Sequence, residues 1–232
     1  MATGSIRASA DRCVCCGRGK GWLYTATFST QRTSTGPSAR GASPTTARYV
    51  DHEALRHALH CPFMASDLGF TCSGCGARHP ELPMNYTADA PAVWDAGFAG
   101  ADDCLLSSDQ CVIRAEHYFV KGLVEIPVLG TDEVFSWGVW VSLSRASFSR
   151  AADMWDQPGR ESEEPYFGWL TTELLVYPET NLNLRTLVHT RPVGERPFVE
   201  LEPTGHPLAV EQRNGITMER VREIAAAVRH PA

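Results

Sequence analysis

The sequence predicts an α+β fold, in which a single domain with a mainly antiparallel sheet flanked by helices follows a mostly disordered N-terminal extension. Three observations lead to this prediction. Strand-like runs are grouped in the middle of the chain, helical patterns stand apart from them, and the composition changes near residue 64. The 232 residues, of which 43% are hydrophobic and 21% charged, suffice for one large globular domain.

The extension is predicted over residues 1–63 and the α+β domain over residues 64–232. Residues 29–48 are rich in Ser, Thr, Arg, Gly and Pro, and such a segment buries too little apolar surface to offset the entropy of ordering it. The charge also reverses: 8 Arg and Lys face 3 Asp and Glu before Met64, whereas 13 face 24 from Met64 onward, a net charge of −11. Three interpretations of the extension stay open: a disordered segment, upstream DNA translated from a misassigned start codon with Met64 as the true start, or a transit peptide.

Two long runs are predicted to form the central hairpin. Apolar residues alternate along residues 117–128 and again along 133–144, and the turn-forming residues LGTD join the two runs. Pro127 is expected near a strand end, because proline cannot donate to an interior ladder. Gly122 and Gly138 are predicted to mark bulges or a close approach of neighbouring backbone.

Two tryptophans on the second of these strands have opposite parity. Trp137 and Trp140 are therefore expected to face opposite sides of the sheet. Because helices are predicted to cover both faces, both side chains are expected to be part of the core.

Helices are predicted over residues 145–156, where Ser144 can serve as the N-cap, and over residues 217–229, where Thr217 can do so. Phe148 and Trp155 are expected to pack the first helix against the sheet. Further strands are predicted at residues 167–176, 184–191 and 197–202.

Several blocks together resemble an uncharacterised bacterial family, number 2199 among the domains of unknown function. They are CSGCGARHPELP, DAPAVW, SSDQCVI, HYFVKGLVEIPV, FSWGVWVSLS, WDQPGRE, PYFGWL, VHTRP and ELEPTGHPLAVEQRNGIT. The resemblance covers about residues 70–229 and leaves the extension out. It implies a domain boundary and no activity.

A C-x-x-C-G turn occurs twice, as CVCCG in the extension and as CSGCG at residues 72–76. In a metal knuckle, such a turn directs both sulfurs at one ion. Cys72 and Cys75 are therefore predicted to form a structural knuckle that binds zinc. Cys111 is the expected third ligand and His79 the fourth, although Pro80 pushes the His79 backbone toward an extended conformation.

Other interpretations of these cysteines stay open. No apolar core of a secretory signal is present in the first thirty residues, which favours a cytoplasmic protein with free thiols or metal ligands over a disulfide framework. Ordinary buried thiols are the main alternative to a metal site. A redox pair is disfavoured, because no strand–CxxC–helix pattern surrounds these residues.

The function predicted from the sequence is a non-enzymatic interaction or regulatory module, with zinc as a candidate stabilising ion. No GxSxG, P-loop, HExxH or dinucleotide-binding motif is present. The acidic domain suits a basic protein partner and disfavours nucleic acid, and no apolar run is long enough for a membrane span. The alternative is a hydrolase-like enzyme that uses His189, Arg191 and Glu202. The sequence carries no signal for an oligomeric state.

Overall fold

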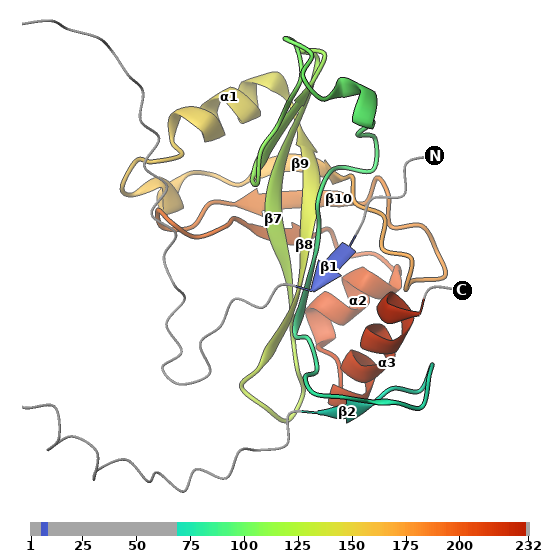
Figure 1. The fold of residues 1–232 in the computed structure, drawn as a ribbon. Coiled ribbons are helices and arrows are strands. Elements are labelled where there is room, and N and C mark those ends of the chain that lie inside the picture. Colours follow the sequence, from blue (N-terminus) through green and yellow to red (C-terminus); the bar gives the residue numbers. More distant parts are fainter. Residues whose placement is uncertain (1–5, 9–68, 231–232) are drawn as a thin grey trace, which may run out of the picture. The chain divides into compact units, whose positions relative to one another are not determined.

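One nine-stranded sheet dominates the computed structural model, which describes residues 6–8 and 69–230 (Figure 1). Its strand order is β1-β4-β8-β9-β10-β11-β7-β6-β5, and β7 also pairs with β8. The strands are β1 (Ile6–Ala8), β4 (Asn85–Ala88), β5 (Leu105–Leu106), β6 (Gln110–Ile113), β7 (His117–Pro127), β8 (Val134–Leu143), β9 (Tyr166–Leu170), β10 (Arg185–His189) and β11 (Phe198–Leu201). A separate small sheet pairs β2 (Phe70–Thr71) with β3 (Arg78–His79).

The predicted central hairpin is confirmed. Strands β7 and β8 pair antiparallel in one continuous register, and Pro127 is the last residue of β7. Both strand glycines lie where another segment approaches closely, as predicted. A Cβ atom on Gly122 would lie 2.6 Å from a methyl group of Val199, and one on Gly138 would collide with the side chain of Thr87.

The sheet is mainly antiparallel, as predicted, but it closes on itself. Because β7 pairs with both β8 and β11, the strands β8-β9-β10-β11-β7 form a closed barrel. The β11–β7 and β4–β8 pairs are parallel, and the other pairs of the sheet are antiparallel. The predicted sheet flanked by helices therefore fits only in part, because five strands of the sheet form a closed barrel. Alternation along a strand is the same for the inside of a barrel and for one face of an open sheet, so the pattern could not distinguish them.

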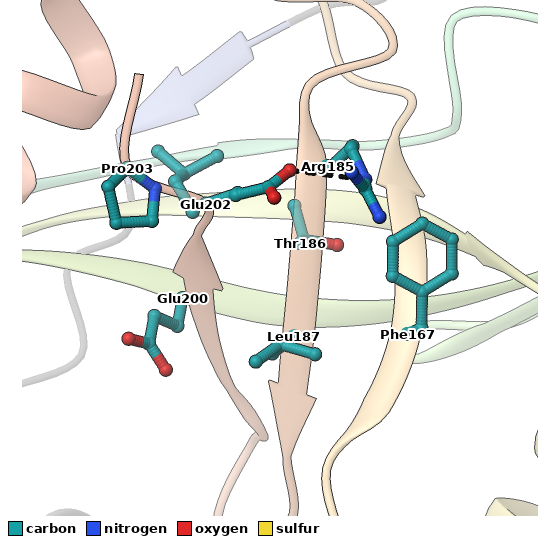
Figure 2. Close-up of a pocket in the computed structure, with 8 residues that line it drawn as sticks. Phe167, Arg185, Thr186, Leu187, Glu200, Glu202 and Pro203 are labelled. Atoms are coloured by element: carbon teal, nitrogen blue, oxygen red, sulfur yellow. Dashed lines mark ion pairs between the residues drawn. The ribbon is translucent and has the colours of Figure 1, made fainter.

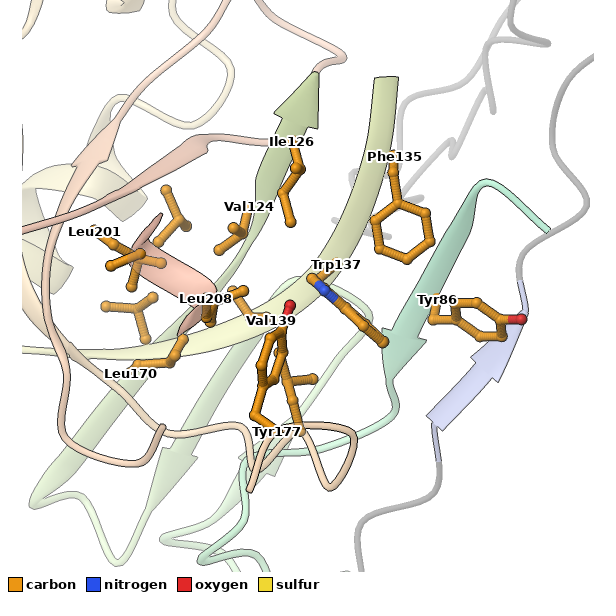
Figure 3. Packing of buried hydrophobic residues seen from close by; sticks show 14 of the residues in the cluster. Tyr86, Val124, Ile126, Phe135, Trp137, Val139, Leu170, Tyr177, Leu201 and Leu208 are labelled. Carbon is orange, nitrogen blue, oxygen red and sulfur yellow. The ribbon is translucent and has the colours of Figure 1, made fainter. Parts of the chain in front are cut away.

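The main core fills the barrel and continues to one of its ends (Figure 3). Trp137 lies in this core with 1% of its surface exposed. Two helices, α2 (Pro207–Asn214) and α3 (Met218–Arg229), contribute further apolar side chains to it. The buried residues of the cluster include Val120, Val124, Ile126, Phe135, Val139, Val141, Leu170, Val188, Val199, Leu201, Leu208, Val221 and Ile224.

A second core lies on the outer side of β7 and β8. Trp140 is fully buried there among Ala88, Cys111, Ile113 and Phe119, and its indole N–H donates to the carbonyl of Ala88 at 3.1 Å. Both tryptophans are thus core residues, as expected. A helix was expected to cover this second face, but no α-helix of the described residues does so. Strand β6 covers it instead, together with side chains from the segment that follows β4, namely Trp94, Phe98 and Cys104.

Two predicted helices are present. The first, α1 (Arg145–Asp153), begins after Ser144, whose hydroxyl accepts from the Ser147 amide at 3.0 Å. It ends at Asp153 rather than at residue 156, so Trp155 lies beyond the helix and not on it as predicted. The ring of Phe148 lies 5.2 Å from that of Tyr118 on β7. Thr217 caps α3 as predicted. No helix among the described residues is long and apolar enough to cross a membrane.

The helix α2 was not predicted, although its signals are in the sequence. Pro207 occupies its first turn, the ring of His206 accepts from the Leu208 amide at 3.1 Å, and Gly215 follows its end. Proline at the start and glycine after the end are typical of helices. The predicted strands at residues 184–191 and 197–202 correspond to β10 and β11, whereas the predicted strand at 167–176 ends at Leu170.

The predicted extension overlaps the described residues only at β1. Residues 6–8 pair antiparallel with β4 at one edge of the sheet. The other residues of the predicted extension, including its CVCCG turn, lie outside the described residues.

The packing at Gly138 can be tested directly. We expect Gly138→Ala to lower the free energy of unfolding by about 1–3 kcal/mol, because the added methyl group overpacks the contact between β8 and β4. Urea denaturation followed by circular dichroism would measure the change. Gly205→Ala is the matched control, because a Cβ atom at Gly205 meets no other atom within 4 Å. Equal stability of the two variants would contradict the close approach.

Candidate metal centre

The turn between β2 and β3 positions the first two sulfurs. The Cys72 amide donates to the carbonyl of Ala77 at 2.9 Å, and the Gly76 amide donates to the carbonyl of Cys72 at 2.8 Å. Gly76 has a φ of +68°, a left-handed conformation that glycine adopts without a steric penalty. The chain therefore turns back directly after Cys75, which leaves Cys72 buried and Cys75 exposed.

His79 lies on β3, opposite Phe70 in the hairpin. Its ring is 5.3 Å from the Phe70 ring, and its Nε2 atom is 3.5 Å from the sulfur of Cys75. Pro80 was expected to favour an extended backbone at His79 and to weaken it as a ligand. The backbone is extended, but because β3 is a strand this conformation directs the ring toward Cys75.

The fourth donor comes from the far end of the described chain. His230 follows the last turn of α3, where its amide donates to the carbonyl of Ala226 at 3.0 Å. Gly74 makes room for its ring, since a Cβ atom on Gly74 would lie 3.0 Å from the Cδ2 atom of His230. The structure thereby brings one ligand atom each from Cys72, Cys75, His79 and His230 within 4.8 Å of one another.

Local electrostatics favour the metal-binding forms of two of these groups. Burial, together with the charge of Arg229 and with His230, lowers the pKa of His79, which favours the neutral ring that binds metals. Burial acts to raise the pKa of the Cys72 thiol. Backbone hydrogen bonds from Cys75 and Gly74, a side-chain hydrogen bond from Cys75 and the charge of Arg229 together outweigh that effect, so the pKa of Cys72 is lowered.

The donor set fits a tetrahedral zinc ion. Zinc bonds of about 2.3 Å to sulfur and about 2.0–2.1 Å to nitrogen place sulfur and nitrogen about 3.6 Å apart and two sulfurs about 3.8 Å apart. The observed 3.5 Å between Cys75 and His79 matches the first of these separations. The longest separation of up to 4.8 Å has to shorten by about 1 Å to bind zinc. Two cysteines and two histidines are a common structural zinc set.

The predicted third ligand, Cys111, is not in this group. It lies on β6, is paired with Phe119 of β7 and is fully buried in the core around Trp140. Burial raises the pKa of its thiol to about 12, so it remains protonated. The prediction assumed that the chain passes beside the knuckle at Ser107 and Ser108. This segment instead joins the edge strand β5 to β6, and β6 pairs with β7.

One sequence signal could have pointed to His230. Arg-His-Pro occurs twice in the chain, at residues 78–80 and 229–231. The residue before a proline avoids the helical conformation, and His230 has φ and ψ angles of −129° and 70°. The restriction that a proline places on the preceding residue therefore ends α3 and gives His230 a non-helical backbone conformation.

The three catalytic candidates do not converge on one cleft. His189 contacts Glu200 at 2.8 Å, Arg191 makes two hydrogen bonds to Glu125 at 2.7 and 2.8 Å, and Glu202 pairs with Arg185 at 3.1 Å. A hollow of about 160 Å³ on β9–β11 is lined by Glu202 but by neither His189 nor Arg191. Each candidate thus has a partner of its own, as expected for groups that stabilise a surface.

Comparison with known proteins places the chain in a family. The model of the family described as "Uncharacterized protein conserved in bacteria (DUF2199)" matches residues 71–216. Because this is more than half of the 232 residues, the chain belongs to that family, as its sequence blocks predict. Three of the four candidate metal ligands fall inside the match and His230 falls beyond it. No curated protein and no solved structure matches the chain.

The ion pairs of these candidates are expected to contribute unequally to stability. Glu125→Gln should destabilise the protein by about 2 kcal/mol, because its bidentate pair with Arg191 is only 26–29% exposed. Glu202→Gln should cost less than about 1 kcal/mol, because its pair with Arg185 is about half exposed. Thermal and urea unfolding would measure both variants, and an equal loss in the two would contradict a structural role for the Arg191–Glu125 pair.

Proposed function

We propose that this member of the DUF2199 family is a zinc-stabilised interaction module and not an enzyme. The observation that carries the proposal is the convergence of Cys72, Cys75, His79 and His230, whose ligand atoms lie within 4.8 Å of one another. These residues come from the two ends of the domain. A zinc ion held by them would join the β2–β3 hairpin to the end of α3.

The hairpin needs such a link. Each of its strands has two residues, and a short two-stranded hairpin is at best marginally stable in water by itself. Its apolar contact with α3 is small, since Phe70 and Cys72 pack there against Ala225 and Ala226, with Leu82 alongside. Figure 1 shows β2 beside α3.

The ligand set favours a structural role for the metal. Four protein ligands complete a tetrahedron, whereas a catalytic zinc ion keeps one position open for water or substrate. Two thiolates also neutralise the charge of the ion. The free energy of zinc binding would then contribute to folding, because an unfolded chain does not hold the four ligands together.

The proposed interaction role rests on the net negative charge of the domain. From Met64 onward 24 Asp and Glu face 13 Arg and Lys, and this excess suits a basic protein partner. The hydrolase alternative lacks comparable support, since His189, Arg191 and Glu202 each pair with a different residue.

The zinc site makes a quantitative prediction. Protein purified without chelator is expected to contain about one zinc ion per chain by elemental analysis, and a strong chelator should lower its melting temperature. Cys75→Ser and His230→Ala should each lose most of the metal and melt at a lower temperature. Both side chains are exposed, so neither substitution leaves a cavity in the core.

Two controls separate metal binding from general damage. Cys111→Ala should keep its zinc, because this cysteine lies in the other core, and His117→Ala should do the same, because His117 is exposed on β7. Gly74→Val should lose zinc affinity although it keeps all four ligands, since its side chain would displace the His230 ring. Metal-free protein whose melting temperature the chelator leaves unchanged would sink the zinc proposal.

A further inference from the structure

The outer face of the barrel is covered on one side and bare on the other. Over β7 and β8 the Trp140 core covers it. Over β9 and β10 the outward side chains of Phe167, Trp169 and Leu187 remain 43%, 42% and 40% exposed. The rings of Phe167 and Trp169 contact edge to face at 5.3 Å, so a fixed aromatic pair borders this bare face.

Carboxylates follow the apolar residues across the same face. The register places Leu187 between Phe167 on β9 and Glu200 on β11. Phe167, Leu187, Glu200 and Glu202, together with Arg185, line the hollow of about 160 Å³ (Figure 2). Glu200 and Glu202 keep 49% and 45% of their side-chain surface exposed although each has an intramolecular partner.

The face already binds an arginine of its own. The guanidinium group of Arg185 lies 5.3 Å from the centre of the Phe167 ring and pairs with Glu202 at 3.1 Å. Figure 2 shows Arg185 between the ring and the carboxylate. An arginine gains here from both the π face and the charge.

The same arrangement recurs at the other end of the face. The guanidinium group of Arg191 lies 5.5 Å from the centre of the Phe198 ring and makes two hydrogen bonds to Glu125. A surface that twice combines an aromatic ring with a carboxylate around an arginine has the chemistry to recognise a further one.

We propose that the outer face of β9–β11 binds an arginine-containing apolar peptide segment of a partner protein. One arginine of the segment enters the hollow, with its methylene groups over Leu187 and its guanidinium group between Glu200 and Glu202. Apolar side chains of the segment cover Phe167 and Trp169. This inference names the partner class of the proposed interaction module and rests on that proposal for its biological role.

Arginine fits this face better than lysine does. Its planar guanidinium group stacks on aromatic rings and bonds two carboxylate oxygens at once, whereas an ammonium group acts as a compact and strongly hydrated charge. The half-exposed position of both carboxylates implies that added salt weakens the contact. The affinity for the peptide should therefore depend on the charge of its side chains and on the shape of the cationic group.

The test uses zinc-loaded full-length protein and a labelled probe peptide, Gly-Arg-Leu-Arg-Phe-Arg-Gly, with fluorescence anisotropy as readout. Binding is expected to saturate and to weaken with added salt. The peptide with citrulline in place of arginine, which keeps the shape but not the charge, should bind at least about tenfold more weakly, and the lysine peptide should fall between them.

A matched pair of double variants locates the site. Glu200→Gln with Glu202→Gln should weaken binding at least about tenfold. Glu219→Gln with Glu223→Gln removes the same charge from ion pairs on α3 and should leave the affinity close to that of the unchanged protein. Leu187→Ala should weaken binding without changing any charge. Melting temperature and zinc content are measured for every variant, so that a failure of the zinc proposal is recognised separately.

Four results would overturn the inference. One is the absence of saturable binding, and another is equal weakening by the two double variants, which would indicate non-specific attraction. The third is equal binding of the citrulline peptide, which would make the face an apolar docking surface. Self-association of the chain that Leu187→Ala abolishes would assign the face to a second copy and would also overturn it.

Discussion

The pairing of β7 with β8 is the interaction on which the rest of the structure depends. Its continuous antiparallel register fixes which side chains face inward and which face outward along both strands. Trp137 thereby enters the barrel and Trp140 enters the outer core, where both are almost completely buried. A shift by one residue would exchange the two tryptophans and both sets of neighbours, so the register is strongly determined by burial on both sides.

Closure of the barrel sets the conditions for the rest of the surface. Because β7 pairs with β11 as well as with β8, the inner face is enclosed, and each strand still has an outer face. The chain covers this outer face over β7 and β8 with strand β6 and the segment after β4. Over β9–β11 it leaves an aromatic pair, Phe167 and Trp169, next to two carboxylates. Exposed apolar side chains that are rimmed by charges are typical of interaction sites.

The proposed metal site would have a different role, that of linking the end of α3 to the β2–β3 hairpin. Helix α3 packs against the main core through Val221, Ile224 and Val228, and Ala225 and Ala226 near its end contact the small β2–β3 hairpin. Two cysteines and two histidines at this place can bind one zinc ion. The free energy of zinc binding at such sites exceeds the free energy gained by burying a few methyl groups. With zinc bound at the proposed site, the hairpin and the end of α3 would stabilise each other.

The sequence by itself determined the local parts of this protein. Alternation predicted β7, β8, β10 and β11, capping residues predicted the starts of α1 and α3, and the C-x-x-C-G pattern with a nearby histidine predicted three members of the metal-ligand group. These features depend on neighbours within a few residues, where backbone geometry and side-chain period act directly. The family blocks were also recognisable without a structure.

Only the tertiary structure decided how these parts meet. Closure of the sheet depends on the β11–β7 pair, which joins strands some 70 residues apart, and alternation carries no information on it. His230 replaces Cys111 in the ligand group because α3 brings the chain end over Gly74, whereas β6 takes Cys111 into a separate core. The separate partners of His189, Arg191 and Glu202 likewise follow from strand order. Contacts between distant segments are set by packing of whole elements, and a local sequence pattern cannot encode that packing.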